Sequence, residues 1–350
     1  MFPVLRKHGT GFSKMASVGQ EDNLWGRFKL GFYTFLEKSG FYRFWRYFNR
    51  DNIVILMLHG VMDEAEPAQW VPTRPQVMQH QFDESLRLIS KYYKIIPISE
   101  AVAMLSGERA FHPNCVVLTF DDGYKNNLTH AWPVLEKHGV SASVYPSVGF
   151  IDRREPFWFE RLDYAIQAAA GKCEAFKLGE ITVEIDAASR DKLRKSVKRA
   201  IVAAKAVPGT DQEARQVIDS AIEFLEKQSG TRLADIFEND PWSAVMTWDD
   251  LREACDVGFE VGSHTVDHAR LALLDEAEIR RQLSDSKVRL EQELDRPVDL
   301  LCYPNGCYNA IVLNVAKECG YRAALTTKEG VNRKGDDLLQ LKRFHLPQGR

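Results

Sequence analysis

Residues 116–124 of this 350-residue chain read VVLTFDDGY, a β-branched apolar run that ends in two adjacent aspartates and a glycine. Pro113 before the run and Gly123 within its end favour a short buried strand over a helix. In α/β folds, catalytic side chains gather where parallel strands end, so Asp121 and Asp122 are candidate site residues. Two neighbouring carboxylates repel each other unless a metal ion holds one while the other accepts a proton. A plain Asp-Asp-Gly turn would use the same residues.

A second predicted strand end carries two histidines four residues apart. Residues 260–268 read EVGSHTVDH, with His264 and His268 at this spacing. If the segment after Ser263 is helical, both imidazoles share one face and can chelate one ion. Imidazole nitrogens together with a carboxylate oxygen suit zinc or a similar divalent metal. The interpretation of this histidine pair as a metal site is stronger because another predicted strand of the chain ends in an Asp-Asp pair.

Together these motifs resemble those of the polysaccharide deacetylase family, the NodB-homology or carbohydrate esterase 4 group. TFDDG at 119–123 resembles the first family motif, SHTVDH at 263–268 the second, and YPNG at 303–306 a degenerate third. The resemblance runs from about residue 53 to the C-terminus and is interrupted once. It implies an α/β fold, a distorted (β/α) barrel that commonly has seven strands. The repeated strand–helix pattern alone does not choose between a barrel and an open sheet.

The resemblance also implies a role for each motif residue. Asp122, His264 and His268 would bind a metal ion, with zinc expected first and cobalt or nickel as alternatives. The ion would polarise an amide carbonyl and lower the pKa of its bound water, whose proton Asp121 would accept as general base. The backbone N–H of Asn305 would help to hold the oxyanion.

The departing amine needs a proton donor, for which two histidines are candidates. His59 follows the apolar strand at 53–58 and resembles the general acid of a family subset with shuffled motif order, although a structural histidine would also fit. His345 resembles the late histidine that serves as general acid in family members with the commoner motif order. The family's third motif usually opens with an arginine that orients the base, but leucine and cysteine stand in its place. We expect Arg343 to substitute from a neighbouring strand.

Two aromatic residues are predicted to contact the sugar, and they lie on either side of a long interruption. Tyr303 opens the third motif, and Trp158 belongs to FWFER at 157–161, which fits equally well as a hinge. Residues from about 164 to 245 break the strand–helix rhythm with charge-rich, helix-forming runs. We interpret them as a helical insert without catalytic residues. The expected runs are 190–206 and 211–230.

The first 50 residues are expected to lie outside the catalytic domain, which we place at 51–350 with the insert at about 164–245. Residues 1–50 form a tail followed by a basic, aromatic and helical segment at 24–50. That segment would either lie in a membrane surface as a peripheral contact or pack across the barrel end. We favour packing, because the aromatic residues are spread around the helix.

The composition of the chain indicates which cell compartment and which partners to expect. The start of the chain lacks the apolar core of a secretory signal, and no stretch reaches the ~20 apolar residues of a spanning helix. Six scattered cysteines without a CxxC pair suggest a reducing compartment. We therefore expect a cytoplasmic protein, with peripheral membrane contact as the variant. A net charge of −3 gives no pervasive basic field, so we expect no nucleic-acid partner.

The expected function is metal-dependent removal of an N-acetyl group from an amino sugar. The substrate would be an oligosaccharide, a polysaccharide or a glycolipid precursor such as a lipid-linked sugar. One alternative is an amidohydrolase acting on a small non-sugar amide or ureide. Another is a non-catalytic carbohydrate-binding or assembly protein, because a fold does not fix a function. The intact aspartates and histidines argue against that last reading, and the missing arginine keeps it open.

Overall fold

The computed structural model describes residues 47–63, 70–74 and 76–346. Most of the predicted basic-aromatic segment lies outside these residues. The main sheet is parallel and has the order β12–β1–β5–β6–β9, with β4 paired to the start of β5. The strands are β1 (Ile53–Leu58), β2 (Val61–Met62), β3 (Val77–Met78), β4 (Lys94–Ile95), β5 (Cys115–Asp122), β6 (Ser143–Pro146), β9 (Glu260–Val261), β10 (Leu300–Cys302), β11 (Ala323–Leu325) and β12 (Phe344–His345).

Seven of these strands close into a distorted barrel. β10 pairs in parallel with β11, and two parallel bridges join this pair to the main sheet. Ser263, just after β9, bridges to Leu301 on one side, and Leu325 bridges to Leu341, just before β12, on the other. The ring β1, β5, β6, β9, β10, β11 and β12 is therefore complete, and its two single-bridge junctions make it irregular. The barrel that the resemblance implied is confirmed.

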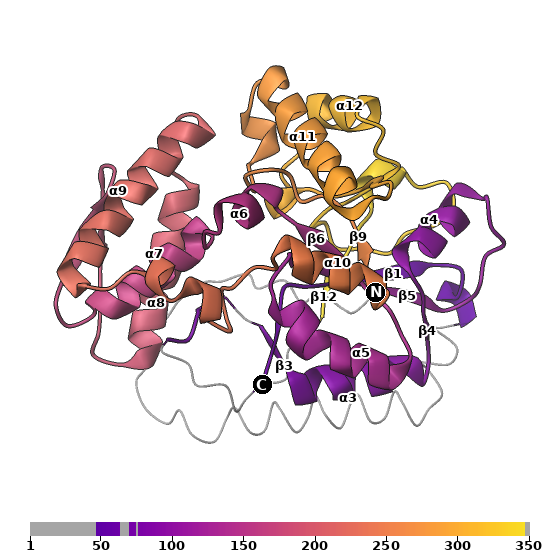
Figure 1. Ribbon diagram of the computed structural model, residues 1–350, viewed down its shortest axis with the longest axis horizontal. Helices are drawn as coiled ribbons and strands as arrows, with labels where there is room; N and C mark the ends of the chain where they lie inside the picture. Colours follow the sequence, from indigo (N-terminus) through magenta and orange to yellow (C-terminus); the bar gives the residue numbers. More distant parts are fainter. Residues whose placement is uncertain (1–46, 64–69, 75, 347–350) are drawn as a thin grey trace, which may run out of the picture.

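Helices cover the outside of the barrel, with α3 and α5 on one side and α11 and α12 on the opposite side (Figure 1). α11 buries the stripe Ile279, Leu283, Leu290 and Leu294, as its helical spacing predicts. In the described part of the chain, no helix combines the length and apolarity needed to cross a bilayer. The helices around the barrel are α3 (Gln79–Ser90), α4 (Ile98–Ser106), α5 (Trp132–His138), α6 (Val148–Arg153), α10 (Trp248–Asp256), α11 (Glu276–Leu294) and α12 (Ala310–Glu318). A π-helical turn, Asn127–Ala131, leads into α5. Short 3-10 turns are Leu233–Asp235, Phe237–Asn239, Leu271–Leu273, Pro304–Gly306 and Leu338–Gln340.

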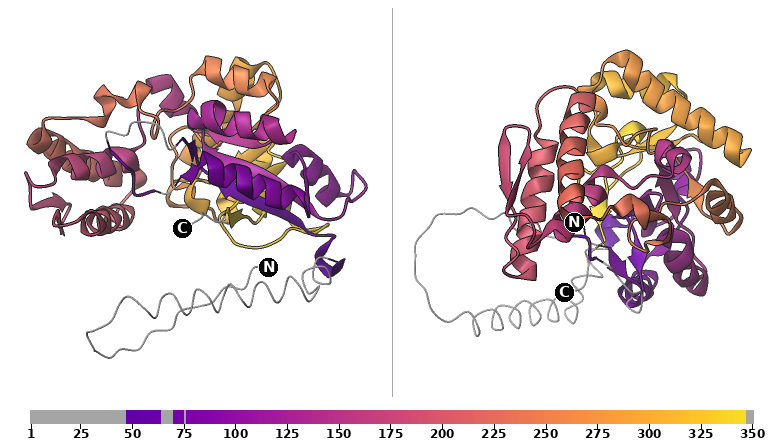
Figure 2. Two further views of the ribbon diagram at one scale, coloured as in Figure 1. Left: turned by 90° about the horizontal axis from the view of Figure 1, so that it is seen from below. Right: turned by 60° about the vertical axis from the view of Figure 1, so that its left-hand side comes forward.

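Between β6 and β9 the chain builds a group of helices that packs on its own core beside the barrel (Figures 1 and 2). Leu162, Ile166, Val197, Ile222 and Leu225 lie in that core and are buried. The two helix-forming runs in the sequence correspond to α8 and α9. A two-stranded hairpin was not predicted, because each strand is four residues long and one is largely exposed. The elements are α7 (Trp158–Ala169), β7 (Ala175–Leu178), β8 (Ile181–Glu184), α8 (Arg190–Lys205) and α9 (Asp211–Ser229).

The chain leaves this insert beside the end of β5. The backbone N–H of Met246 donates to the carbonyl of Gly123 over 2.9 Å, and the N–H of Lys125 donates to the carbonyl of Ala244 over 2.8 Å. An antiparallel bridge joins Tyr124 to Val245 between them. The return of the insert is thus hydrogen-bonded to the turn that follows Asp122.

Candidate active site

The two aspartates of TFDDG are buried at the carboxyl end of β5. Asp121 and Asp122 are 4% and 2% exposed. The strand stops here because Asp122 and Gly123 both take φ of 73°, which turns the backbone away from the sheet. A Cβ on Gly123 would come within 2.6 Å of Pro146 Cβ on β6, so the turn requires glycine for space as well as for conformation.

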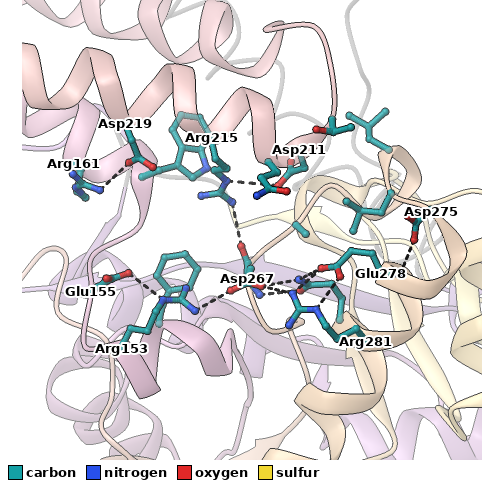
Figure 3. A pocket seen from close by; sticks show the side chains of 18 of the residues that line it. Arg153, Glu155, Arg161, Asp211, Arg215, Asp219, Asp267, Asp275, Glu278 and Arg281 are labelled. Carbon is teal, nitrogen blue, oxygen red and sulfur yellow. Dashed lines mark hydrogen bonds and ion pairs between the residues drawn. The ribbon is translucent and has the colours of Figure 1, made fainter.

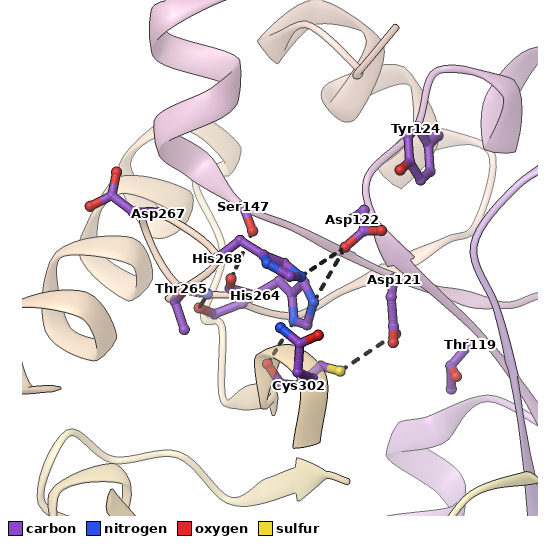
Figure 4. Close-up of polar contacts among 12 residues, drawn as sticks. Thr119, Asp121, Asp122, Tyr124, Ser147, His264, Thr265, Asp267, His268 and Cys302 are labelled. Carbon is purple, nitrogen blue, oxygen red and sulfur yellow. Dashed lines mark hydrogen bonds and ion pairs between the residues drawn. The ribbon is translucent and has the colours of Figure 1, made fainter. Parts of the chain in front are cut away.

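Asp122 faces both histidines of the second motif (Figure 4). Its Oδ1 lies 3.4 Å from His264 Nε2 and 3.4 Å from His268 Nε2. This Oδ1 is buried and has no hydrogen-bond partner among the described residues. His264 Nδ1 donates to the Cys302 carbonyl over 2.7 Å, so Nε2 is the ring nitrogen that faces Asp122. The three atoms fit a divalent cation with two imidazole ligands and one carboxylate.

The two histidines come together in a loop, so the helical arrangement considered as one way to pair them is not the one that the structure uses. Thr265 and His268 take left-handed φ values of 68° and 52°, which a helix cannot accommodate. The loop is stabilised instead by Gln282 on α11, whose Oε1 accepts from Val266 N over 3.1 Å and from Asp267 N over 2.9 Å. The position of the two histidines therefore depends on a side chain outside the motif.

A second cavity of about 670 Å³ lies behind this loop, between α9 and α11 (Figure 3). Asp267, next to His268, is at its centre. The Asp267 carboxylate accepts from Arg153 over 2.9 Å and from Arg281 over 2.8 Å. Arg215 on α9 donates to the Asp267 carbonyl over 3.1 Å, so the insert contacts the histidine loop directly. These contacts brace the loop from its outer side.

Asp121 is held by Arg343 in a buried ion pair. Arg343 Nη1 and Nη2 donate to the two carboxylate oxygens over 2.7 and 2.8 Å, and the arginine is 1% exposed. Burial alone would raise the pKa of Asp121, but Arg343 outweighs it and lowers that pKa to about 2. Arg343 thus makes the contact that we expected of it, and its effect on the reaction stays a prediction. Cys302, which replaces the expected arginine, places Sγ 3.4 Å from Asp121 Oδ1.

The aspartates and histidines open onto a cavity of about 520 Å³. His59 and His345 both line it, with ring centroids 6.5 Å apart, and Asn305 lines it with a left-handed φ of 55°. Burial, aided by the nearby charge of Arg74, lowers the pKa of His59 to about 3. His59 is therefore a neutral imidazole at pH 7 in the free protein.

Comparison with known proteins agrees with this arrangement. The family model described as polysaccharide deacetylase matches residues 108–175 and 210–324, which is more than half of the chain. The chain belongs to the polysaccharide deacetylase family. Members of this family are hydrolases that act on N-acetyl amide bonds of carbohydrates. The match omits residues 176–209, which contain α8.

Similarity to individual proteins is low in sequence and extends over most of the chain. The deacetylase is 20% identical over 305 residues to the Bacillus subtilis (strain 168) protein named "Putative polysaccharide deacetylase YxkH", covering 82% of this chain and 77% of that protein. The Streptococcus pyogenes deacetylase PplD superposes with a TM-score of 0.53 at 20% identity, covering 85% of this chain and 93% of that one. IcaB from Ammonifex degensii superposes with a TM-score of 0.53 at 16% sequence identity, covering 85% of this chain and 92% of that one. At these identities the structural likeness supports the fold alone.

Two residues expected to contact the sugar do not line the catalytic cavity of the deacetylase. Tyr303 is fully buried and packs in the core beneath α12, where its ring stacks on Tyr308 with centroids 4.9 Å apart. Trp158 lines the second cavity, behind the histidine loop. The Tyr303 prediction rested on its place in the third motif, and the Trp158 prediction on an aromatic run beyond a strand end, but neither residue lines this cavity.

The sequence did not reveal a buried polar chain that begins at Asp122. Arg74 Nη2 donates to Asp122 Oδ2 over 2.5 Å, and Arg74 Nη1 donates to the Tyr124 hydroxyl over 2.8 Å. That hydroxyl donates to Glu160 over 2.6 Å. Burial raises the pKa of Glu160 well above its usual range. Glu160 was detectable as a charge at the end of an aromatic run, whereas nothing in the local sequence marks Arg74.

Proposed function

We propose that this deacetylase removes the N-acetyl group from an amino sugar within an oligosaccharide, a polysaccharide or a glycolipid precursor. The observation that carries the proposal is the juxtaposition of Asp122, His264 and His268 with the ion-paired Asp121. A divalent metal held by the first three, with zinc as our first choice and cobalt or nickel as substitutes, supplies the Lewis acidity that polarises an amide carbonyl.

The residues around this site divide the proton transfers. Asp121 accepts a proton from the attacking water, and Arg343 keeps Asp121 ionised at neutral pH so that it can do so. The backbone N–H of Asn305 donates to the developing oxyanion. His59 then protonates the departing amine, so that acetate and a free amino sugar are released.

His59 can act as this acid only after it takes up a proton, since its pKa is about 3 in the free protein. Negative charge that develops on the substrate raises the pKa of a neighbouring imidazole, which favours that uptake during the reaction. His345 lines the same cavity and is the alternative donor. Both therefore enter the tests below.

Metal content and acetate release, measured together on N-acetylglucosamine oligomers, test the proposal. We expect wild type to bind one divalent metal and release acetate. We expect Asp121→Asn to keep the metal without releasing acetate, and Asp122→Asn to lose the metal. Metal without acetate would refute the sugar substrate and favour a small amide or ureide, which a panel of such amides would then reveal. A wild-type protein that binds neither zinc nor cobalt would refute the proposed mechanism.

A further inference from the structure

One wall of the catalytic cavity is a face of α8 in the insert. Lys198, Ile201, Val202 and Lys205 all line the cavity, and their spacing of three, four and seven residues places them on one side of the helix. The two apolar residues lie between the two lysines. The wall therefore presents an apolar patch with a positive charge at each end, next to the residues proposed for catalysis.

Neither lysine forms an ion pair with any residue in the described part of the chain. The one hydrogen bond found there for either ammonium joins Lys205 Nζ to Asn305 Oδ1 over 2.9 Å, and that acceptor is neutral. Lys198 is exposed at the cavity and makes no such contact there. By contrast, Arg153, Arg215 and Arg281 around the second cavity each form an ion pair with an acidic residue.

The carboxylates of the catalytic cavity are already bonded to other groups. Asp122 pairs with Arg74, and Asp121 pairs with Arg343. The carboxylate of Asp163 accepts from the backbone N–H and hydroxyl of a threonine and from the amide of a glutamine, and that of Glu160 accepts from the Tyr124 hydroxyl. Among the described residues none of these carboxylates forms an ion pair with a lysine of α8, and a bound divalent metal would add further positive charge.

The whole of α8 is basic, whereas the protein as a whole is slightly acidic. The helix sequence RDKLRKSVKRAIVAAK contains seven basic residues and one acidic residue, while the chain has a net charge of −3. A concentrated positive charge at the mouth of a cavity attracts anions and raises their local concentration. The acetamido group that the proposed reaction removes supplies no such anion, because an amide is neutral.

We propose that the substrate carries a negatively charged substituent, such as a phosphate or a carboxylate, close to the acetamido sugar, and that Lys198 and Lys205 bind it. The inference rests on the proposed function and narrows its substrate class to anionic glycans. The apolar residues between the lysines contact the part of the substrate that joins the acetamido sugar to the charged group. α8 then selects the substrate, while the barrel strands carry the reaction.

The test compares a double variant with a matched control on the same helix. Lys198→Gln/Lys205→Gln removes both charges, and glutamine keeps an N–H donor for Asn305 Oδ1. Lys192→Gln/Lys195→Gln changes the helix charge by the same amount at positions that do not line the cavity. Each metal-loaded protein is assayed for acetate release from a neutral N-acetylglucosamine tetramer and from tetramers that carry one phosphate or one carboxylate.

For wild type we expect kcat/KM to be about tenfold or more higher for an anionic tetramer than for the neutral one, as one or two charge-assisted contacts would give. The ratio of kcat/KM for an anionic tetramer to that for the neutral one should fall to near one in Lys198→Gln/Lys205→Gln, mainly because KM for the anionic tetramer rises. In the control variant this ratio should stay at the wild-type value. The two anionic tetramers show whether phosphate or carboxylate is preferred. Equal kcat/KM for neutral and charged tetramers, or a preference that survives in the double variant, would overturn the inference.

A binding measurement separates this inference from the proposed function. If metal-loaded wild type releases no acetate from any tetramer, the proposed function fails, and calorimetric affinities then decide the inference on their own. Tighter binding of a charged tetramer that is lost in Lys198→Gln/Lys205→Gln and kept in the control would support it. Equal affinity for neutral and charged tetramers would refute it.

Discussion

Replacing Arg343 with methionine tests whether the ion pair with Asp121 is required. Methionine fills part of the same volume but leaves a carboxylate that is 4% exposed without its two hydrogen bonds of 2.7 and 2.8 Å. Removing one partner of a buried pair costs about 3–5 kcal/mol of folding free energy. We also expect kcat to fall tens-fold or more with metal content intact, because the unpaired Asp121 is buried and its pKa rises, which removes the ionised base.

Urea unfolding and acetate release, both with metal-loaded protein, measure these two effects. The double variant Arg343→Met/Asp121→Asn is the control, because it removes both charges and should recover much of the stability lost in Arg343→Met while staying inactive. In wild type the depressed pKa of Asp121 contributes stability above a pH of about 4, the ordinary aspartate value, and this is lost as the pH falls towards about 2. A single variant that loses under about 1 kcal/mol, or keeps the wild-type kcat, would refute the reasoning.

Three further variants probe the turn, the loop and the proton donor. Gly123→Ala should cost more than Gly139→Ala in urea unfolding, because both positions have positive φ but only the first is crowded by a neighbouring strand; equal costs would contradict this. Gln282→Leu leaves two backbone N–H groups of the histidine loop without their acceptor, so metal affinity, measured by competition with a chelator, should fall about 10–100-fold. An unchanged affinity would show that the loop keeps its conformation without Gln282. His59→Ala should lower kcat about 10²–10⁴-fold and His345→Ala less than tenfold, and the reverse order would make His345 the acid.

The sequence allowed prediction of features that depend on local pattern. The apolar run before TFDDG specified β5 and placed Asp121 and Asp122 at its end, and the charge-rich runs specified α8 and α9. These succeed because strand and helix periodicities are properties of neighbouring residues.

Contacts between distant segments could not be predicted in the same way. The histidine loop is shaped by Gln282, which follows it by more than a dozen residues, and Arg74 precedes Asp122 by 48. Nothing near either residue marks it as part of the site. Arg343 was predicted only because the third motif lacks its usual arginine. Its contact with Asp121 depends on the pairing of β1 with both β5 and β12, which brings the two residues together.

The hydrogen bonds that join residues 244–246 to the turn after Asp122 fix the return of the insert to the barrel, so the part of the insert that forms α8 can vary without moving that turn. Both ends of the insert are fixed to the barrel, one by β6 and the other by this pairing, so a longer or shorter insert changes mainly a loop whose closure cost grows slowly with length. Relatives could therefore exchange this segment as a cassette and acquire a different cavity wall. Selection for a new glycan can then act on α8 while the reaction chemistry is inherited unchanged.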